Sequence, residues 1–161
     1  MPRPTWRWLV LLLTCVAGVQ ATEIRGPAEV IDGDSLRIRD VEIRLSGIDA
    51  PEFKQTCQRG RKHWPCGRAA RDALRDLVAH TTIRCDWGAK DDYQRLLAVC
   101  YDGDRDLNEE MVRLGMALAY RRYSDRYVAA ENAARLSERG IWSSEFVVPW
   151  LWRQLDRRRN R

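Results

Sequence analysis

The fold is decided by the stretch AEVIDGDSLRIRDVEIRLSGI, which covers residues 28–48. Residues 28–31 and 35–39 have the composition of short β-strands, and an Asp-Gly turn separates them. In residues 41–48 apolar and polar side chains alternate, so Arg44 points to the face opposite its apolar neighbours. The stretch therefore predicts consecutive short strands with acidic residues at their edges.

The rest of the chain alternates between helical and extended patterns, and it contains no internal repeat. Apolar residues recur at helical spacing in 66–80, 107–115 and 127–139, and glycines end the last two segments. Segments 82–87 and 96–101 have strand composition and are joined by a polar turn. Short strands interrupted by a helix favour the α+β class, as a five-stranded OB-fold-like β-barrel with about three flanking helices.

The two ends of the chain differ in composition from the middle. Residues 1–21 combine a basic start, a short apolar run and small side chains before a possible cleavage point, which predicts a secretory signal peptide. An uncleaved membrane anchor is the alternative, although the apolar run is short for a membrane span. Residues 22–152 form the predicted domain. Residues 153–161 contain five arginines and one aspartate, and we expect a mobile basic tail there.

Export of the chain would leave four cysteines in the mature protein. An even number in an oxidising compartment predicts two disulfides. Cys57 and Cys66 lie in one loop before a helix, and Cys85 and Cys100 lie on two segments joined by a single turn, so we expect these pairings. A four-cysteine zinc site is the alternative, but zinc ligands usually come in closely spaced pairs, which are lacking here.

The net charge is +5, but it is unevenly distributed. Much of it lies in the leader and in the arginine tail, and the body between them is close to neutral. Residues 53–71 are the exception, because they contain six lysines and arginines and no acidic residue. Such a segment can attract a polyanion, although a solvated surface is the simpler interpretation for the charges alone.

The acidic residues around the first strands have the chemistry of a metal site. Asp32, Asp34, Asp49 and Glu52 offer carboxylate oxygens, which hard divalent cations prefer. The Asp-Gly-Asp-Ser start resembles an EF-hand loop, but the glycine and glutamate that such a loop needs further along are missing, so that interpretation fails. For Asp32, beside a glycine, a turn-forming role is the default.

Arginines can grip a phosphate with two parallel hydrogen bonds, which a lysine cannot match. Arg44 and Arg95 are the candidates, because they accompany the acidic residues in the sequence.

Four blocks, in order, resemble the staphylococcal nuclease family. They are IDGDSL at residues 31–36, RLSGIDAPE at 44–52, DYQRLLA at 92–98 and LNEEMVRLG at 107–115, and GIWS at 140–143 is similar to the family as well. The resemblance covers roughly residues 24–145. A single block would be weak evidence, whereas the ordered combination is specific.

This resemblance implies a calcium ion held by the carboxylates of Asp34 and Asp49 and by the backbone carbonyl of Ala50. The family often has threonine at the position of Ala50, but a carbonyl ligand survives that difference. Asp32 matches a nearby acid that supports the metal loop.

The resemblance also implies the catalytic residues of a calcium-dependent endonuclease that cuts DNA and RNA and leaves 3′-phosphates. Glu52 would act as general base, while Arg44 and Arg95 would hold the phosphate and stabilise the transition state. Gln94 replaces the glycine usually found before the second arginine, which makes Arg95 the least secure assignment.

Tyr93 and Tyr120 match aromatic positions near the nucleotide, and packing is an equal interpretation for both. We expect a monomer, exported to the periplasm or secreted, without stable membrane association once the signal peptide is removed.

Three other functions remain possible. A non-catalytic nucleic-acid-binding module of the same fold would lack some of the active-site positions, and none is missing here. A metal-independent ribonuclease would need paired histidines, and the chain has only His63 and His80. A purely structural secreted domain would leave the ordered acids and arginines unexplained.

Overall fold

The computed structural model describes residues 22–159 of the chain. The predicted signal peptide at residues 1–21 lies outside the described residues. Within 22–159, none of the helices combines the length and the apolar character needed to cross a membrane.

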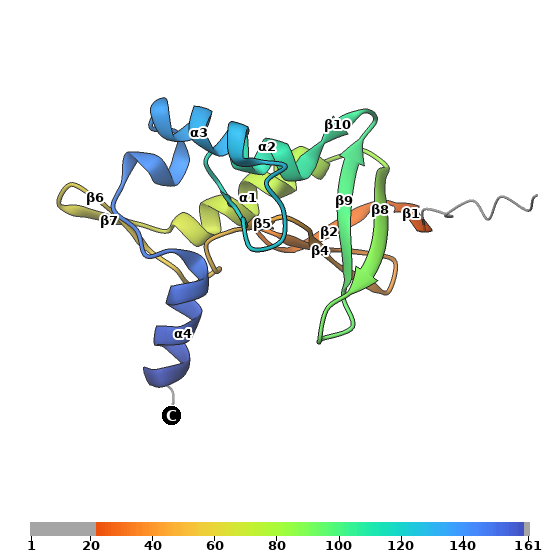
Figure 1. Ribbon diagram of the computed structural model, residues 1–161, viewed down its shortest axis with the longest axis horizontal. Coiled ribbons are helices and arrows are strands. Elements are labelled where there is room, and N and C mark those ends of the chain that lie inside the picture. The colour runs from red at the N-terminus through yellow and green to blue at the C-terminus, as the bar shows by residue number, and fades with distance from the viewer. Residues whose placement is uncertain (1–21, 160–161) are drawn as a thin grey trace, which may run out of the picture.

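A curled sheet of seven strands forms the body of the molecule (Figure 1). The strand order is β1-β8-β9-β4-β3-β2, and β10 pairs with β9. All neighbours are antiparallel except β4 and β9, which run parallel and place Arg44 beside Leu97. The strands are β1 (Thr22–Gly26), β2 (Ala28–Asp32), β3 (Ser35–Ile38), β4 (Val41–Leu45), β8 (Ile83–Lys90), β9 (Leu96–Asp102) and β10 (Arg105–Asp106).

Two short strand pairs accompany the main sheet. The pair of β5 (Ile48–Asp49) and β11 (Leu118–Ala119) lies next to the end of β4. The hairpin of β6 (Cys57–Arg59) and β7 (Lys62–Trp64) precedes the first helix.

Four α-helices surround the sheet, and one of them stands apart. Helix α1 (Cys66–Val78) packs on β2, while α2 (Leu107–Arg113) and α3 (Val128–Leu136) lie together on the other side of α1 (Figure 1). A short 3-10 helix, η1 (Gly140–Ser143), follows α3. Helix α4 (Pro149–Arg159) projects from the body, with most of its length away from the other helices (Figure 1).

The core lies between the curled sheet and α1. Alternation along β3 and β4 directs their apolar side chains inward, and α1 contributes Ala70, Leu74 and Val78 from one face. Burial of such side chains stabilises the fold by about 1.5–3 kcal/mol each. The same alternation leaves Arg44 partly exposed between the buried Ile43 and Leu45, as the sequence predicts.

One buried polar side chain ties α2 to the sheet. Asn108 is fully buried, and its side-chain amide donates to the carbonyls of Ser46 and Ala98, at 2.9 and 3.1 Å. Its side-chain oxygen accepts a hydrogen bond from the backbone N–H of Cys100 at 3.1 Å. Because every polar atom of Asn108 is paired, its burial fixes the end of β4 without an unsatisfied group.

Both predicted disulfides are present. Cys57 bonds to Cys66, and Cys85 bonds to Cys100. The second pair joins residues that lie directly opposite each other on β8 and β9, so this disulfide is consistent with the hydrogen-bonded register of the two strands. Each closed loop should stabilise the native state by roughly 2–4 kcal/mol.

The α+β, OB-fold-like prediction is confirmed, with some differences in detail. The main sheet has additional short strands, β1 and β10, whose polar sequences carry no clear alternation. The expected boundary of a tail at residue 153 falls inside α4, which continues to Arg159. The sequence shows no amphipathic pattern for this helix because it carries many arginines and almost no buried face.

Candidate active site

Two buried carboxylates and an arginine form the centre of the site. Asp34 lies in the turn between β2 and β3, and Asp49 ends β5; their side chains are 7% and 0% exposed. Arg44 reaches both from β4, because its Nη2 donates at 2.9 Å to Asp34 Oδ2 and to Asp49 Oδ1. One nitrogen thus contacts both of the carboxylates that the sequence predicts as metal ligands. The backbone N–H of Ala50 also donates to Asp34 Oδ2 at 3.1 Å.

Negative charge is crowded in this region. Burial, together with the nearby charges of Asp34 and Glu52, raises the pKa of Asp32 to about 6, although hydrogen bonds from Gly33 and Phe53 lower it in part. Burial also raises the pKa of Asp49, with the charge of Asp34 adding to the effect, although hydrogen bonds from Arg153 lower it in part. Both carboxylates therefore favour an added cation.

The backbone of Glu52 is fixed by buried neighbours. Gln55 is fully buried; its backbone N–H donates to the Glu52 carbonyl at 2.7 Å, and its side-chain oxygen accepts from the Glu52 N–H at 3.3 Å. Gly67, at the start of α1, lies so close that a Cβ atom there would be 1.8 Å from the Glu52 carbonyl oxygen. The carboxylate itself remains 27% exposed and faces the pocket.

Arg95 is held by an acid that the sequence reading did not single out. Its Nε donates to Asp91 Oδ2 at 2.7 Å, while Asp91 Oδ1 accepts from the backbone N–H groups of Tyr93 and Arg95. Burial would raise the pKa of Asp91, but the hydrogen bonds from Arg95 keep it below its ordinary value. Asp91 therefore shapes the turn and orients the guanidinium of Arg95.

Gln94 adopts the conformation for which glycine is preferred. Its φ is 65°, in the left-handed region. The backbone of this tight turn explains why glycine suits the position, and the turn nevertheless places Arg95 at the pocket.

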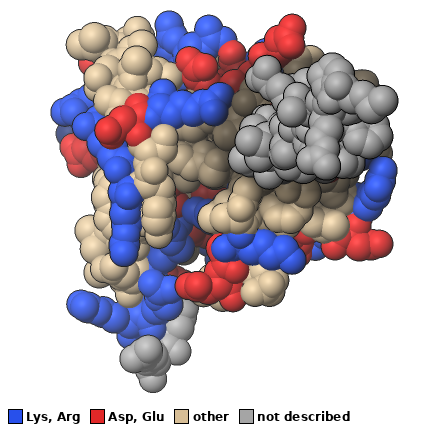
Figure 2. Space-filling view, turned by 45° about the vertical axis from the view of Figure 1, so that its right-hand side comes forward, with Lys and Arg blue, Asp and Glu red and all other residues tan. Residues whose placement is uncertain are grey.

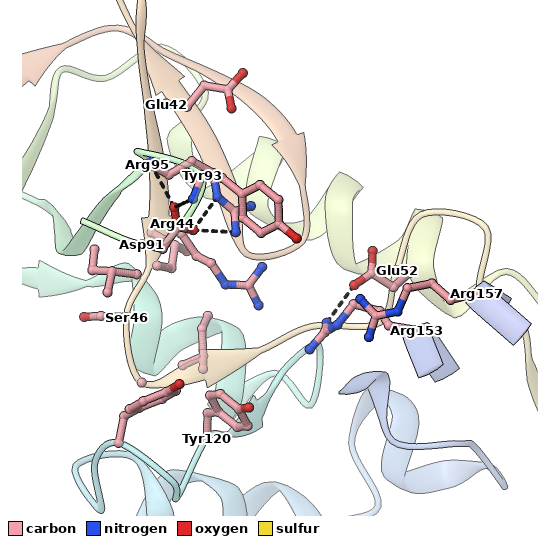
Figure 3. A pocket seen from close by; sticks show the side chains of 15 residues that line it. Glu42, Arg44, Ser46, Glu52, Asp91, Tyr93, Arg95, Tyr120, Arg153 and Arg157 are labelled. Carbon is pink, nitrogen blue, oxygen red and sulfur yellow. Dashed lines mark hydrogen bonds and ion pairs between the residues drawn. The ribbon is translucent and has the colours of Figure 1, made fainter. Parts of the chain in front are cut away.

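A pocket of about 680 Å³ brings these groups together. Arg44, Glu52, Arg95, Tyr93 and Tyr120 all line it, whereas Asp34 and Asp49 lie beneath Arg44. Figure 3 shows Arg44 entering from β4 and Arg153 approaching Glu52 from the other side. The predicted arginines, Glu52 and the two tyrosines thus surround one space, and Arg44 connects that space to the buried acids.

The donor set fits a hard divalent cation in its chemistry. Asp34 and Asp49 are buried carboxylates within hydrogen-bond reach of one nitrogen, and burial together with the charge of Asp34 raises the pKa of Asp49. In residues 22–159 no three His, Cys, Asp or Glu side chains gather as a metal cage, so further ligands would have to be backbone oxygens or water. The staphylococcal nuclease family is generally metal-dependent.

Sequence reasoning missed several residues that build the site. Asp91 and Gln55 act through hydrogen bonds, Gly67 through close packing, and Arg153 through ion pairs with Asp49 and Glu52. The position of Asp91 four residues before Arg95 was a usable signal, since acids often organise such turns. Nothing local in the sequence marks the other three.

Three arginines of the basic segment at residues 53–71 stack on aromatic rings. Arg68 and Arg71 lie over the ring of Phe53, at 5.5 and 4.4 Å, and Arg59 lies over Trp64 at 4.6 Å. Figure 2 shows basic and acidic side chains interleaved across the face in view. Aromatic rings therefore hold three guanidinium groups of this segment in position.

Comparison with known proteins agrees with this site. The family model described as staphylococcal nuclease homologue matches residues 42–144. A protein of Escherichia coli O157:H7 named "Uncharacterized endonuclease" is 38% identical over 132 residues, covering 77% of this chain and 80% of that protein. One of the same name from Haemophilus influenzae is 34% identical over 137 residues, covering 80% of this chain and 72% of that protein.

A relative with a different name is similar at the same level. The "Succinoglycan biosynthesis protein ExoI" of Rhizobium meliloti is 34% identical over 142 residues, covering 84% of this chain and 72% of that protein. The family model and the extent of these matches show that the chain belongs to the staphylococcal nuclease homologue family.

Proposed function

We propose that the protein is a calcium-dependent endonuclease that hydrolyses phosphodiester bonds of DNA and RNA. Membership of a nuclease family makes the chain a hydrolase acting on nucleic acid, and relatives are named as endonucleases. The observation that carries the finer proposal is Arg44 joining two buried acids at a pocket that also receives Glu52 and Arg95.

Asp34, Asp49 and the carbonyl of Ala50 would hold the calcium ion. When bound, the ion would polarise the phosphate and orient water, which are the roles open to a cation that acidifies water poorly. Asp32, hydrogen-bonded to Gly33 and Phe53, supports the loop from below and does not contact the pocket.

Glu52 would take a proton from the attacking water. Its carboxylate faces the pocket while its backbone is held on both sides, so the position of the side chain is defined. Attack at phosphorus forms a new P–O bond, and the 5′-oxygen then leaves and takes a proton from solvent. The products would be a 3′-phosphate and a 5′-hydroxyl.

Arg44 and Arg95 would offset the charge that develops on the phosphate. Each guanidinium is already oriented by a carboxylate, Arg44 by Asp34 and Asp49 and Arg95 by Asp91, so little reorganisation is needed in the reaction. Tyr93 and Tyr120 stand at the pocket wall and would contact the nucleotide.

The test is cleavage of single-stranded DNA and of RNA by the protein expressed from the full coding sequence. We expect cleavage of both with calcium, none after chelation, and weaker cleavage with magnesium or manganese. End-group analysis should find 3′-phosphates. Binding of DNA without cleavage in any of these metals would contradict the proposal and favour a non-catalytic binding module.

We also propose that the chain is exported and acts as a monomer. The two disulfides are compatible with an oxidising compartment. The mass of the purified protein should correspond to removal of residues 1–21, and thiol titration without reductant should detect no free cysteine. Elution at the volume of a monomer in size-exclusion chromatography would support the monomer proposal. Retention of residues 1–21 in the purified protein would favour the membrane-anchor alternative.

A further inference from the structure

Helix α4 is joined to the active site through one arginine. Arg153 Nη1 donates to Asp49 Oδ1 at 2.9 Å and to Glu52 Oε1 at 2.7 Å, and Arg153 Nη2 donates to Asp49 Oδ2 at 3.2 Å. We call these three hydrogen bonds the α4 contact. It reaches both oxygens of the expected metal ligand and one oxygen of the expected general base.

Helix α4 buries few side chains of its own within the described part of the chain. Pro149 is its only buried residue among those described, and Leu151 and Leu155 are each 41% exposed. Trp150 is 38% exposed and lies beside Tyr120, with ring centroids 6.1 Å apart. Helices with so few buried contacts belong to the least stable parts of a fold. The α4 contact therefore joins a helix with few buried side chains to the centre of the site.

The oxygens used by the α4 contact are the same ones that the proposed reaction needs. A cation bound to Asp49 must take at least one oxygen that Arg153 now occupies, and Arg153 also holds Oε1 of Glu52, one of the two oxygens that could face the attacking water. Arg153 also brings a positive charge next to a position meant for a cation, which opposes cation binding.

We propose that Arg153 competes with the metal ion for Asp49, so that α4 closes the site without metal and is released when the metal binds. The proposal rests on the metal-dependent function above. In this arrangement Arg153 is a positioning residue: metal binding removes it from Asp49, and the same movement frees Glu52. Metal loading and activation of the base are thereby coupled through one side chain.

Calcium binding to the full protein, measured by titration calorimetry without substrate, tests the competition. If the closed form is about 90% populated, it reduces the apparent affinity about tenfold, so Arg153→Ala should bind calcium about tenfold more tightly than wild type. Arg157→Ala removes the same charge from the same pocket, four residues away on α4, and should change the affinity about twofold or less. Arg153→Lys keeps the charge but cannot span both carboxylates, so it should fall between wild type and Arg153→Ala.

Hydrogen exchange of residues 149–159 tests the release of α4 directly. We expect calcium to speed exchange of these amides about fivefold or more in wild type and in Arg157→Ala. In Arg153→Ala, exchange should already be fast and should not respond to calcium. Thermal unfolding of each variant verifies that the body remains folded.

The possible results separate this inference from the proposed function. Equal calcium affinities for Arg153→Ala and Arg157→Ala, or α4 exchange that calcium leaves unchanged or slows, would overturn it while the nuclease proposal stands. Loss of calcium binding in Asp34→Asn, which does not contact Arg153, locates the ion at the expected site. If wild type binds no calcium at all, the proposed calcium dependence fails, and the competition fails with it.

Discussion

Replacement of Gly67 by alanine should inactivate the enzyme without unfolding it. A Cβ atom at position 67 would lie 1.8 Å from the carbonyl oxygen of Glu52 and 2.6 Å from its carbonyl carbon. Ordinary carbon–oxygen contacts are about 3.3 Å or longer, so the two backbones would have to separate by about 1.5 Å. That movement would stretch the 2.7 Å hydrogen bond from the Gln55 N–H to the Glu52 carbonyl and would displace the Glu52 side chain with it.

The size of the effect follows from this displacement. A misplacement of about 1 Å at a reacting group can cost about 10²-fold in rate, so kcat/KM should fall by about 10²-fold or more. Overpacking should cost about 1–3 kcal/mol of stability, partly offset by alanine's better helix propensity. For a domain of this size the melting temperature should fall by about 2–8 °C, which leaves the variant folded at 25 °C.

The assay is single-stranded DNA cleavage at 25 °C with saturating calcium, with the melting temperature and circular dichroism measured on the same samples. Gly88→Ala in β8 is the matched control, because no atom lies within 4 Å of its added Cβ and its φ is not positive. We expect that control to retain activity within about twofold. If Gly67→Ala is folded and keeps more than half of the wild-type kcat/KM, the argument that α1 positions Glu52 is refuted.

Three other predictions follow from individual contacts. Arg44→Lys keeps the charge but loses the guanidinium that joins Asp34 and Asp49, so kcat should fall by about 10²–10³-fold. The control Arg37→Lys, on the solvent side of β3, should lower kcat by less than about twofold. Equal losses of kcat in the two variants would show that Arg44 has no special role. Gln94→Gly removes the strain of a side chain in the left-handed region and should raise the free energy of unfolding by about 0.5–1 kcal/mol in a urea titration. Gln94→Ala keeps a Cβ atom and should give no such gain. A glycine variant less stable than wild type would show that Gln94 is not strained. In chelator, the raised pKa of Asp32 means that its stabilising protonated form is fully present below its ordinary pKa of 3.8 and is lost as the pH rises through about 6. Asp32→Asn should therefore gain stability relative to wild type between pH 4 and 7, by on the order of 3 kcal/mol, and a constant difference over that range would show that Asp32 is not perturbed.

The parts of the site that could be predicted from sequence depend on local geometry. The alternation around Arg44 determines which face it occupies, and the Asp-Gly turn places Asp34 at the end of a hairpin. The disulfide between Cys85 and Cys100 follows in the same way from two strands joined by one turn. Each of these features needs information from only a few neighbouring residues or from one hairpin.

The parts that could not be predicted depend on contacts between distant segments. Arg153 meets Asp49 across 104 residues, and the Gln55 side chain donates to the Val147 carbonyl across 92. Composition predicts a mobile basic tail around Arg153, and no pattern in the sequence marks Gln55. From its neighbours in the sequence, Gly67 is only a weak helix former. The structure shows why a side chain does not fit there, because the backbone of Glu52, in a different segment, lies against it.

The positive φ of Gln94 is an intermediate case. The resemblance to a family with glycine at this position drew attention to it, but the sequence could not show whether the turn had changed. The structure keeps the turn, and the carboxylate of Asp91 accepts hydrogen bonds from the two N–H groups that flank Gln94. Those bonds explain how a non-glycine residue is tolerated beside Arg95.

Single-turnover cleavage by Glu52→Gln measures whether Glu52 activates the attacking water in a metal-dependent nuclease site. The amide keeps the size of the side chain but cannot accept the proton, so at saturating calcium the rate should fall by about 10²–10⁴-fold. Glu29→Gln, an exposed position on β2, should cleave at the wild-type rate. A Glu52→Gln rate within about threefold of wild type would show that Glu52 is not the general base.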